Sequence, residues 1–284
     1  MHEARPSRTA LRVALRRAAH QLYDARPLVF EDPIAVAILG PHAEQLERTP
    51  GRDASRKPRP YSIGLRAFLV ARSRYAEDLL ACGVERGVTQ YVLLGAGLDT
   101  FAHRNPYPSL RVFEVDHPAT QEWKRELLSN SGLPHPANLV YVPVDLEQQS
   151  LTDQLQASGF DPAAPTFFSW LGVVPYITLD AFRKTLRFIS AQPSGTGVVF
   201  DYVQPRAVLP PNEQLAHDSI SSRVQLAGES FQLFLTPEDI ARELAAFHTI
   251  EDLGCSEINA RYFAARTDKL KTLGSAPRLV SAWI

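Results

Sequence analysis

Tyr91-Val92-Leu93-Leu94-Gly95-Ala96-Gly97-Leu98-Asp99-Thr100 joins a run of apolar residues to a turn that contains two glycines. The uninterrupted apolar run is typical of a β-strand that is buried on both faces. Because glycine has no Cβ, Gly95 and Gly97 let the backbone pass close to a ligand. The stretch therefore predicts a strand that ends in a ligand-binding turn. A two-glycine turn is weak evidence by itself, so its value depends on the residues around it.

Further apolar runs follow along the chain and alternate with helical patterns. This alternation is typical of βαβ units, and it predicts an α/β, Rossmann-like fold with a mostly parallel sheet and helices on both faces. The runs that we interpret as further strands are Arg111–Val115, Leu139–Val142, Thr166–Trp170 and Gly197–Tyr202. The helical patterns lie at 118–129, 149–157 and 179–190.

Two last strands, at 247–253 and 261–265, would bring the sheet to seven strands. Before them, Thr236 and Pro237 have the sequence of a helix start, with Thr236 as the N-cap and Pro237 at the first helical position. The long stretch 203–235 is interpreted as an insert on the substrate side of the core.

The first 88 residues differ from the rest, because they contain helical patterns at 9–24, 33–39 and 61–82 and no strand. We interpret residues 1–88 as an N-terminal helical cap or lid on a core that spans 89–284, within a single domain of 284 residues. The polar stretch from Pro41 to Pro60 is either a lid or a tolerated surface insertion.

Composition limits the function classes. Lys plus Arg is 30 and Asp plus Glu is 31, so the net charge of −1 argues against a nucleic-acid partner. We find no apolar segment long enough to span a membrane and no signal-peptide core. Two cysteines are too few for a multi-cysteine zinc site, so no metal is expected. We expect a cytoplasmic protein with a small-molecule partner, either monomeric or homodimeric.

Acidic residues follow the second and third strands. Asp116 lies 19 residues after Gly97, where a carboxylate can bind both hydroxyls of a ribose. Asp145 comes after the third strand, where it could accept a hydrogen bond from an adenine amino group while Leu146 packs on the ring. The alternative for Asp145 is a turn residue or a helix cap. Acids after both strands favour the nucleotide site.

Two residues of the turn bear on which nucleotide binds. A dinucleotide-binding turn has a third glycine at position 100, and here that residue is Thr100. The acid before it, Asp99, would repel a phosphate. A ligand without phosphate and with a positive charge fits better, and S-adenosylmethionine (SAM) is such a ligand.

Arg72 lies in the middle of the apolar stripe of the helix at 61–82, whereas Arg74 lies on the opposite, solvated face. A guanidinium on a buried face needs an anionic partner. The carboxylate of SAM and an internal acid are equally good candidates for Arg72. In the first helix, Arg8, Arg12 and Arg16 are predicted to form a solvated stripe.

These residues resemble the class I SAM-dependent methyltransferases of the leucine carboxyl methyltransferase group, in particular its bacterial O-methyltransferase branch. The resemblance covers nearly the whole chain. The motifs that carry it are Arg8-Thr9-Ala10, Phe30-Glu31-Asp32-Pro33, Ala71-Arg72-Ser73-Arg74, Leu94–Thr100, Glu114-Val115-Asp116-His117-Pro118, Val144-Asp145-Leu146 and Trp170–Thr178. The resemblance implies that SAM is bound by Arg72, Gly95, Gly97, Asp116, Asp145 and Leu146. Ala96 and His117, inside the same motifs, complete the expected set.

The sequence departs from the family at the end of the fourth strand. Many relatives have a Glu there, close to the methionine part of SAM, but the matching stretch here is Ser169-Trp170-Leu171-Gly172. Trp170 and Leu171 are expected to make this wall apolar. Tyr176 and Arg223 are the other candidates for contacts with the acceptor.

The expected reaction is O-methylation of a small-molecule carboxylate or hydroxyl by an in-line methyl transfer that relies on positioning. A hydroxyl acceptor needs a base, but no histidine has a spacing that singles it out, so no catalytic residue is assigned. The alternatives are a nicotinamide-dependent oxidoreductase on the same fold and a SAM-binding protein without catalytic activity.

Overall fold

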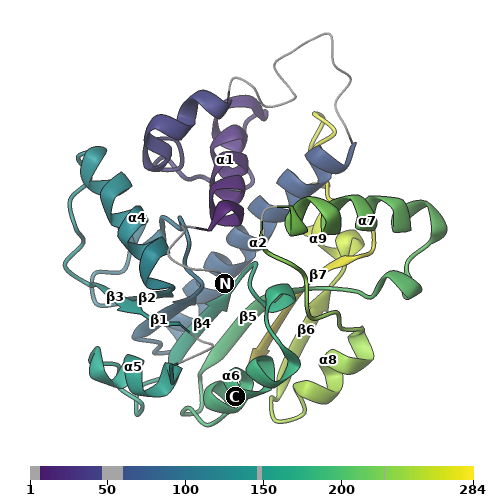
Figure 1. The fold of residues 1–284 in the computed structure, drawn as a ribbon. Coiled ribbons are helices and arrows are strands. Elements are labelled where there is room, and N and C mark those ends of the chain that lie inside the picture. The colour runs from purple at the N-terminus through teal and green to yellow at the C-terminus, as the bar shows by residue number, and fades with distance from the viewer. Residues whose placement is uncertain (1–6, 47–59, 146–148, 227) are drawn as a thin grey trace.

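A computed structural model of the chain describes residues 7–46, 60–145, 149–226 and 228–284. Seven strands form one sheet in the order β3-β2-β1-β4-β5-β7-β6 (Figure 1). The strands are β1 Gln90–Leu94, β2 Arg111–Asp116, β3 Leu139–Pro143, β4 Thr166–Trp170, β5 Gly197–Val203, β6 Thr249–Leu253 and β7 Pro277–Trp283. The pairs among β1 to β5 are parallel, whereas β7 pairs antiparallel with both β5 and β6. This confirms the predicted seven-stranded, mostly parallel sheet.

The helices predicted at 9–24, 61–82, 118–129, 149–157 and 179–190 lie close to their predicted positions, whereas the one predicted at 33–39 is found at 37–46. The helices of the structure are α1 Arg8–Tyr23, η1 Ala37–Leu46, α2 Pro60–Glu85, α3 Phe101–Arg104, α4 Pro118–Asn130, α5 Leu151–Ala157, α6 Leu179–Ser190, α7 Pro211–Gln225, α8 Pro237–Glu243 and α9 Cys255–Tyr262, with the 3₁₀ turns η2 Val174–Tyr176 and η3 Arg206–Val208. The predicted start of α8 is confirmed, since Thr236 caps the helix and exchanges hydrogen bonds with Asp239.

The strand predicted at 261–265 is wrong. Residues 255–262 form α9, and the last strand, β7, comes later. The Gly254 N–H donates to the Glu257 carboxylate, which favours a helix at this point. A short apolar run such as the one around Phe263 does not by itself distinguish a strand from a helix. Phe263 is buried in the cluster on the α2 side of the sheet.

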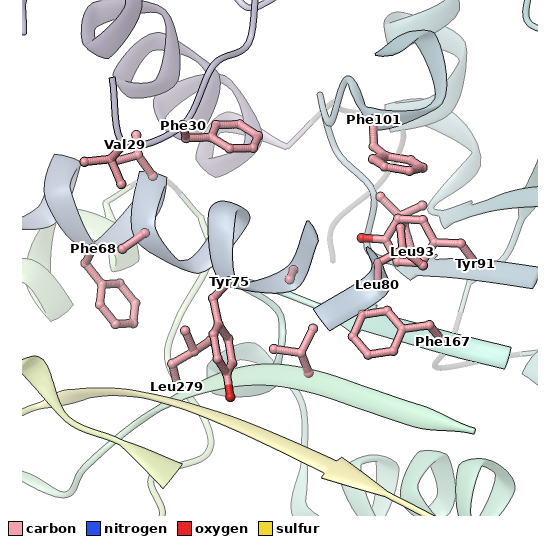
Figure 2. Close-up of a cluster of buried hydrophobic side chains, with 14 of the residues drawn as sticks. Val29, Phe30, Phe68, Tyr75, Leu80, Tyr91, Leu93, Phe101, Phe167 and Leu279 are labelled. Atoms are coloured by element: carbon pink, nitrogen blue, oxygen red, sulfur yellow. The ribbon is translucent and has the colours of Figure 1, made fainter. Parts of the chain in front are cut away.

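Two apolar clusters cover the two faces of the sheet, because successive strand residues point in opposite directions. On one face, Tyr91 and Leu93 of β1 pack with residues of α2, α3 and α9. Figure 2 shows this cluster, with Tyr75 of α2 close to Leu279 of β7. On the other face, Val92 and Leu94 pack with α5, α6 and α8.

The N-terminal elements pack together and onto the core. α1 contacts both α2 and η1, and η1 contacts α4. The loop expected from Pro41 to Pro60 begins later than predicted, because residues 41–46 belong to η1 and Pro60 begins α2. The remainder of that loop, 47–59, lies outside the described residues.

The strand order places a switch point between β1 and β4, where the chain connections run to opposite sides. In open α/β sheets, ligands bind beside such a point at the carboxyl ends of the strands. The glycine turn follows β1 and Gly172 follows β4, so both predicted site segments lie there.

The buried ion pair between Lys124 of α4 and Glu114 of β2 provides a test of stability. Lys124 Nζ lies 2.6 Å from the Glu114 carboxylate, and both side chains are almost fully buried. Lys124→Met leaves that carboxylate without its partner, so we expect a loss of about 3–5 kcal/mol in the free energy of unfolding at pH 7. Urea denaturation measures this loss, and Lys184→Met on the exposed face of α6 is the control.

The same variant has an expected pH dependence. Burial raises the pKa of Glu114, so the protonated form favours the folded state. The deficit of Lys124→Met should therefore shrink as the pH falls from neutral toward and through the raised pKa of Glu114. An equal deficit at all pH values would contradict the assignment to this carboxylate.

Candidate functional site

A pocket, which we call the cofactor pocket, lies at the carboxyl ends of β1, β2 and β3. Its lining brings together all the described residues of the expected cofactor set: Arg72, Gly95, Ala96, Gly97, Asp116, His117 and Asp145. Leu146 lies outside the described residues, so its predicted contact with the ring stays a prediction. Residues that were predicted from segments far apart in the sequence therefore lie in the lining of one pocket.

The glycine turn has the backbone shape that its sequence predicts. Gly95 has φ +70° and Gly97 has φ +50°, a region that disfavours other residues. A Cβ on Gly95 would lie 2.3 Å from Val173 Cγ2, and a Cβ on Gly97 would lie 3.1 Å from Cβ of Ala10. Both glycines are thus required by close approach, and Ala10 places α1 directly against the turn.

Asp116 lies where the turn and the end of β2 meet. Its carboxylate accepts hydrogen bonds from the Gly97 N–H at 2.5 Å and from the His117 N–H at 2.7 Å. Burial raises its pKa even though these two bonds favour the charged form. His117 itself is the N-cap of α4, with its ring accepting from the Ala119 N–H. The turn and the acid thus hold each other in place.

Arg72 is bound by an internal acid, which was one of the two predicted alternatives. Its Nη1 lies 2.8 Å from Oδ2 of Asp201 on β5, and both side chains are buried. The other carboxylate oxygen of Asp201 accepts from the Gly172 N–H at 2.5 Å. Arg72 still lines the cofactor pocket, so both predicted roles are compatible with its position.

Asp201 was missed by the sequence analysis. It lies on β5 beside the end of β4, where its carboxylate accepts a hydrogen bond from the Gly172 N–H. One signal was available, because an acid between Phe200 and Tyr202 in an otherwise apolar strand needs a partner.

Asp99 forms an ion pair within the protein, which the sequence analysis did not predict. Asp99 does not present an unpaired charge to the ligand, since its carboxylate lies 3.2 Å from Nη1 of Arg17 on α1. Burial alone would raise the pKa of Asp99, but Arg17, Lys124 and Arg104 lower it below its ordinary value. Thr100, in place of a glycine, donates from Oγ1 to Asp32 at 2.8 Å. These residues tie the N-terminal segment to the turn.

A second pocket of about 400 Å³ continues from the first. The residues common to both linings, which we call the junction, are Thr9, Val13, Arg72, Gly172 and Tyr176. Beyond the junction the lining is mostly apolar and comes from α1, α2, α7 and the end of β5. Figure 1 shows α1 and α7 above the sheet in this view.

Trp170 does not line either pocket, which corrects its expected place on the acceptor wall. It is fully buried on the opposite face of the sheet, stacked on Phe182 at 5.5 Å between ring centroids. Side chains alternate along a strand, so Ser169 and Leu171 face the cofactor pocket while Trp170 points away. Of Trp170 and Leu171, which were both expected to make this wall apolar, only Leu171 lies on it.

The predicted solvated arginine stripe of the first helix is confirmed for Arg8 and Arg12, which are exposed, whereas Arg16 is half-buried. Arg12 and Arg16 also line the second pocket, together with Arg223 of α7. Tyr176 lies at the junction. Arg74 forms an ion pair with Asp78 at 2.6 Å on the outer face of α2, as its helical position indicated.

The sheet order, the glycine turn and the acid after β2 define a class I methyltransferase site. The chain belongs to the leucine carboxyl methyltransferase family, whose family model matches residues 10–190. A Bacillus subtilis (strain 168) protein, YktD, named as a candidate SAM-dependent methyltransferase, is 32% identical over 295 residues that cover 95% of each chain. A Mycobacterium tuberculosis H37Rv protein with the same description is 36% identical over 179 residues, which cover 61% of this chain and 56% of that protein.

Solved structures agree on the fold. A Thermobifida fusca protein described as a candidate methyltransferase superposes with a TM-score of 0.58 at 16% identity, covering 99% of this chain and 96% of that chain. A Streptomyces avermitilis protein of the duf574 family gives a TM-score of 0.57 at 16% identity, with 96% of each chain covered. Likeness at this identity concerns the fold alone.

The protein is a SAM-dependent methyltransferase, which excludes the alternative of a nicotinamide-dependent oxidoreductase. The residues present fit SAM: the backbone of the glycine turn and the carboxylates of Asp116 and Asp145 line one pocket, which suits a ligand with ribose hydroxyls and a positively charged sulfur. Across the described ranges, no helix is long and apolar enough to cross a membrane. Within those same ranges, no group of three or more His, Cys, Asp or Glu could hold a metal ion.

Asp116→Ala tests the ribose contact. The variant should lose about 2–4 kcal/mol of binding free energy for SAM and S-adenosylhomocysteine, because hydrogen bonds to a charged group are strong and the ribose hydroxyls lose their partner. Isothermal titration calorimetry measures the loss, and Asp153→Ala on exposed α5 is the control. An affinity equal to that of the control would place the ribose elsewhere.

The two arginines of α2 give a matched pair. Arg72→Ala should weaken SAM binding by about tenfold or more, and Arg74→Ala by about twofold or less, since only Arg72 lines the pocket. Arg72→Ala leaves Asp201 buried without its partner, so Arg72→Met combined with Asp201→Asn serves as the variant with both charges removed. Equal affinities of the folded variants would show that Arg72 does not contact the cofactor.

Proposed function

We propose that this methyltransferase transfers the methyl group to an oxygen of a small molecule, either a carboxylate or a hydroxyl. The observation that supports this most is the second pocket, which opens onto the cofactor pocket at the junction and is mostly apolar beyond it. Its size lies in the range of small-molecule sites. The family's name refers to methylation of a carboxyl group, which is a methylation on oxygen.

Bound SAM supplies a methyl group on a positively charged sulfur, and the sulfur leaves as a neutral thioether. The protein's own residues therefore do not have to stabilise a charged leaving group. Their task is to align the acceptor oxygen with the methyl carbon and to exclude water. A carboxylate acceptor carries its negative charge already, whereas a hydroxyl acceptor has to lose a proton as the C–O bond forms.

Tyr176 lines both pockets at the junction, and we propose that it orients the acceptor. Burial raises its pKa to about 12, so its hydroxyl stays protonated at neutral pH. Such a hydroxyl can donate a hydrogen bond to an acceptor oxygen, but it cannot take up a proton from it. We therefore assign Tyr176 to substrate positioning and not to general-base catalysis.

Labelled SAM incubated with a panel of aromatic acids, fatty acids and phenols tests the proposal. We expect an O-methylated product from at least one acceptor, and mild alkali distinguishes the two chemistries because it cleaves a methyl ester but not a methyl ether. Tyr176→Phe should lower turnover about tenfold while SAM affinity changes little. Binding of SAM without transfer to any acceptor would instead support the non-catalytic alternative.

A further inference from the structure

The segment 228–232, between α7 and α8, forms part of the wall of the cofactor pocket. The residues of this segment that line the pocket are Gly228, Glu229, Ser230 and Gln232. The Gln232 N–H donates to the Pro175 carbonyl at 2.7 Å, and the Gln232 side chain donates to the Tyr176 carbonyl at 2.8 Å. Pro175 and Tyr176 belong to η2, the turn that follows β4. These bonds hold the segment against the β4 side of the cofactor pocket.

Glu229 is the acid of this segment, and its printed contact reaches across to α1. The hydroxyl of Ser7, the N-cap of α1, donates to Glu229 Oε1 at 2.8 Å. Among the described residues, no arginine, lysine or histidine forms an ion pair with Glu229. A hydroxyl carries no charge, so these residues do not balance the negative charge of Glu229.

The charge of Glu229 acts on the end of the cofactor pocket that holds the junction. Burial is the main cause of the raised pKa of Tyr176, and the negative charge of Glu229 raises that pKa further. Such an effect requires a carboxylate close to Tyr176, because the interaction between charges weakens with distance. The bonds of Gln232 to η2 place the segment at the same end of the pocket.

The other acids of the cofactor pocket already have a partner or an expected role. The acids that line the pocket are Asp99, Asp116, Asp145 and Glu229. Asp99 pairs with Arg17 at 3.2 Å. Asp116 and Asp145 follow β2 and β3, where the ribose and the adenine of SAM are expected. Glu229 therefore lies beside a different part of the ligand.

The order of the strands indicates which part of SAM that is. The carboxyl ends of β3, β2, β1 and β4 follow one another along one edge of the sheet. With the adenine beside β3 and the ribose beside β2, the methionine part is expected beside β1 and β4, where the junction lies. This part carries an ammonium and a carboxylate group, so it needs both an anion and a cation from the protein. Arg72 is a cation at the junction, and Glu229 is an anion at the same end.

From this arrangement we propose that Glu229 binds the ammonium group of the methionine part of SAM. The ammonium group has three N–H donors, and Oε2 of Glu229 accepts no hydrogen bond from the described residues. A hydrogen bond between two charged groups is among the strongest that a protein makes with a ligand. Arg72 and Glu229 then bind the two opposite charges of the methionine part. The inference does not depend on the methyl acceptor, so it is independent of the proposed O-methylation.

Isothermal titration calorimetry tests the inference with two ligands: S-adenosylhomocysteine, and its analogue in which a hydrogen atom replaces the amino group. Both contain the adenosine and the carboxylate, and only the first contains an ammonium group. Glu229→Gln removes the charge but keeps an oxygen that can accept from the Ser7 hydroxyl. It should weaken the binding of S-adenosylhomocysteine by about tenfold or more and that of the analogue by about twofold or less. Glu238→Gln at the exposed start of α8 is the control and should change neither.

Equal weakening of both ligands by Glu229→Gln would overturn the inference, because the carboxylate would then act only by holding Ser7 and the start of α1. Unchanged binding of both ligands would place the ammonium group elsewhere. Ser7→Ala separates the two roles, since it removes the contact with α1 and leaves the charge of Glu229. It should weaken S-adenosylhomocysteine by about threefold or less, and a loss as large as that of Glu229→Gln would contradict the proposal. Thermal unfolding of each variant shows that it is folded under the conditions of the titration.

Discussion

Arg17 is the residue through which the N-terminal segment and the cofactor turn depend on each other. Its guanidinium lies 3.2 Å from Asp99, donates to the Leu98 carbonyl at 2.5 Å and approaches Asp32 at 3.6 Å. Arg104 approaches the same Asp32 at 3.4 Å. Removing one member of such a buried group leaves the others uncompensated, which typically costs about 3–5 kcal/mol. The group thus fixes the turn whose shape the cofactor requires.

This coupling changes the interpretation of the N-terminal helices. A lid that opens as a unit would have to separate Arg17 from Asp99 and Ala10 from Gly97, exposing a charged cluster and a close-packed contact at once. The described part of the cap is better understood as one wall of both pockets. For the same reason, we expect deletion of α1 to disturb the glycine turn and to weaken cofactor binding.

The features that follow from local rules could be predicted from the sequence. The strand before Gly95, the acid at Asp116 and the outward position of Arg74 depend on short patterns of burial and spacing, and the structure places all three as expected. The partner of Arg72 depends on which strand lies beside β4. That neighbour, β5, is reached through a long crossover that no local pattern specifies.

The errors have a common physical origin. Trp170 was expected on the acceptor wall because the apolar run Thr166–Trp170 does not show which of its residues face which side of the sheet, and a shift by one residue reverses the face of every side chain. Arg16 was assigned to solvent because an arginine stripe on a helix is usually hydrated. In the structure Arg16 is half-buried beside Arg12, whose guanidinium donates to the backbone carbonyl of Arg223 on α7, a long-range contact. In both cases contacts with elements distant in the sequence determine the environment of the side chain, which the periodicity of the sequence does not specify.

The charges are distributed differently on the two sides of the junction. Asp116 and Asp145 line the cofactor side, which suits a ligand that carries a positive sulfur, while Arg12, Arg16 and Arg223 line the other side. Between them, Arg72 and Asp201 neutralise each other in a buried pair. A neutral boundary lets the two charged regions lie close without either attracting the other's ligand. The buried Arg72–Asp201 pair therefore lies where the two pockets meet.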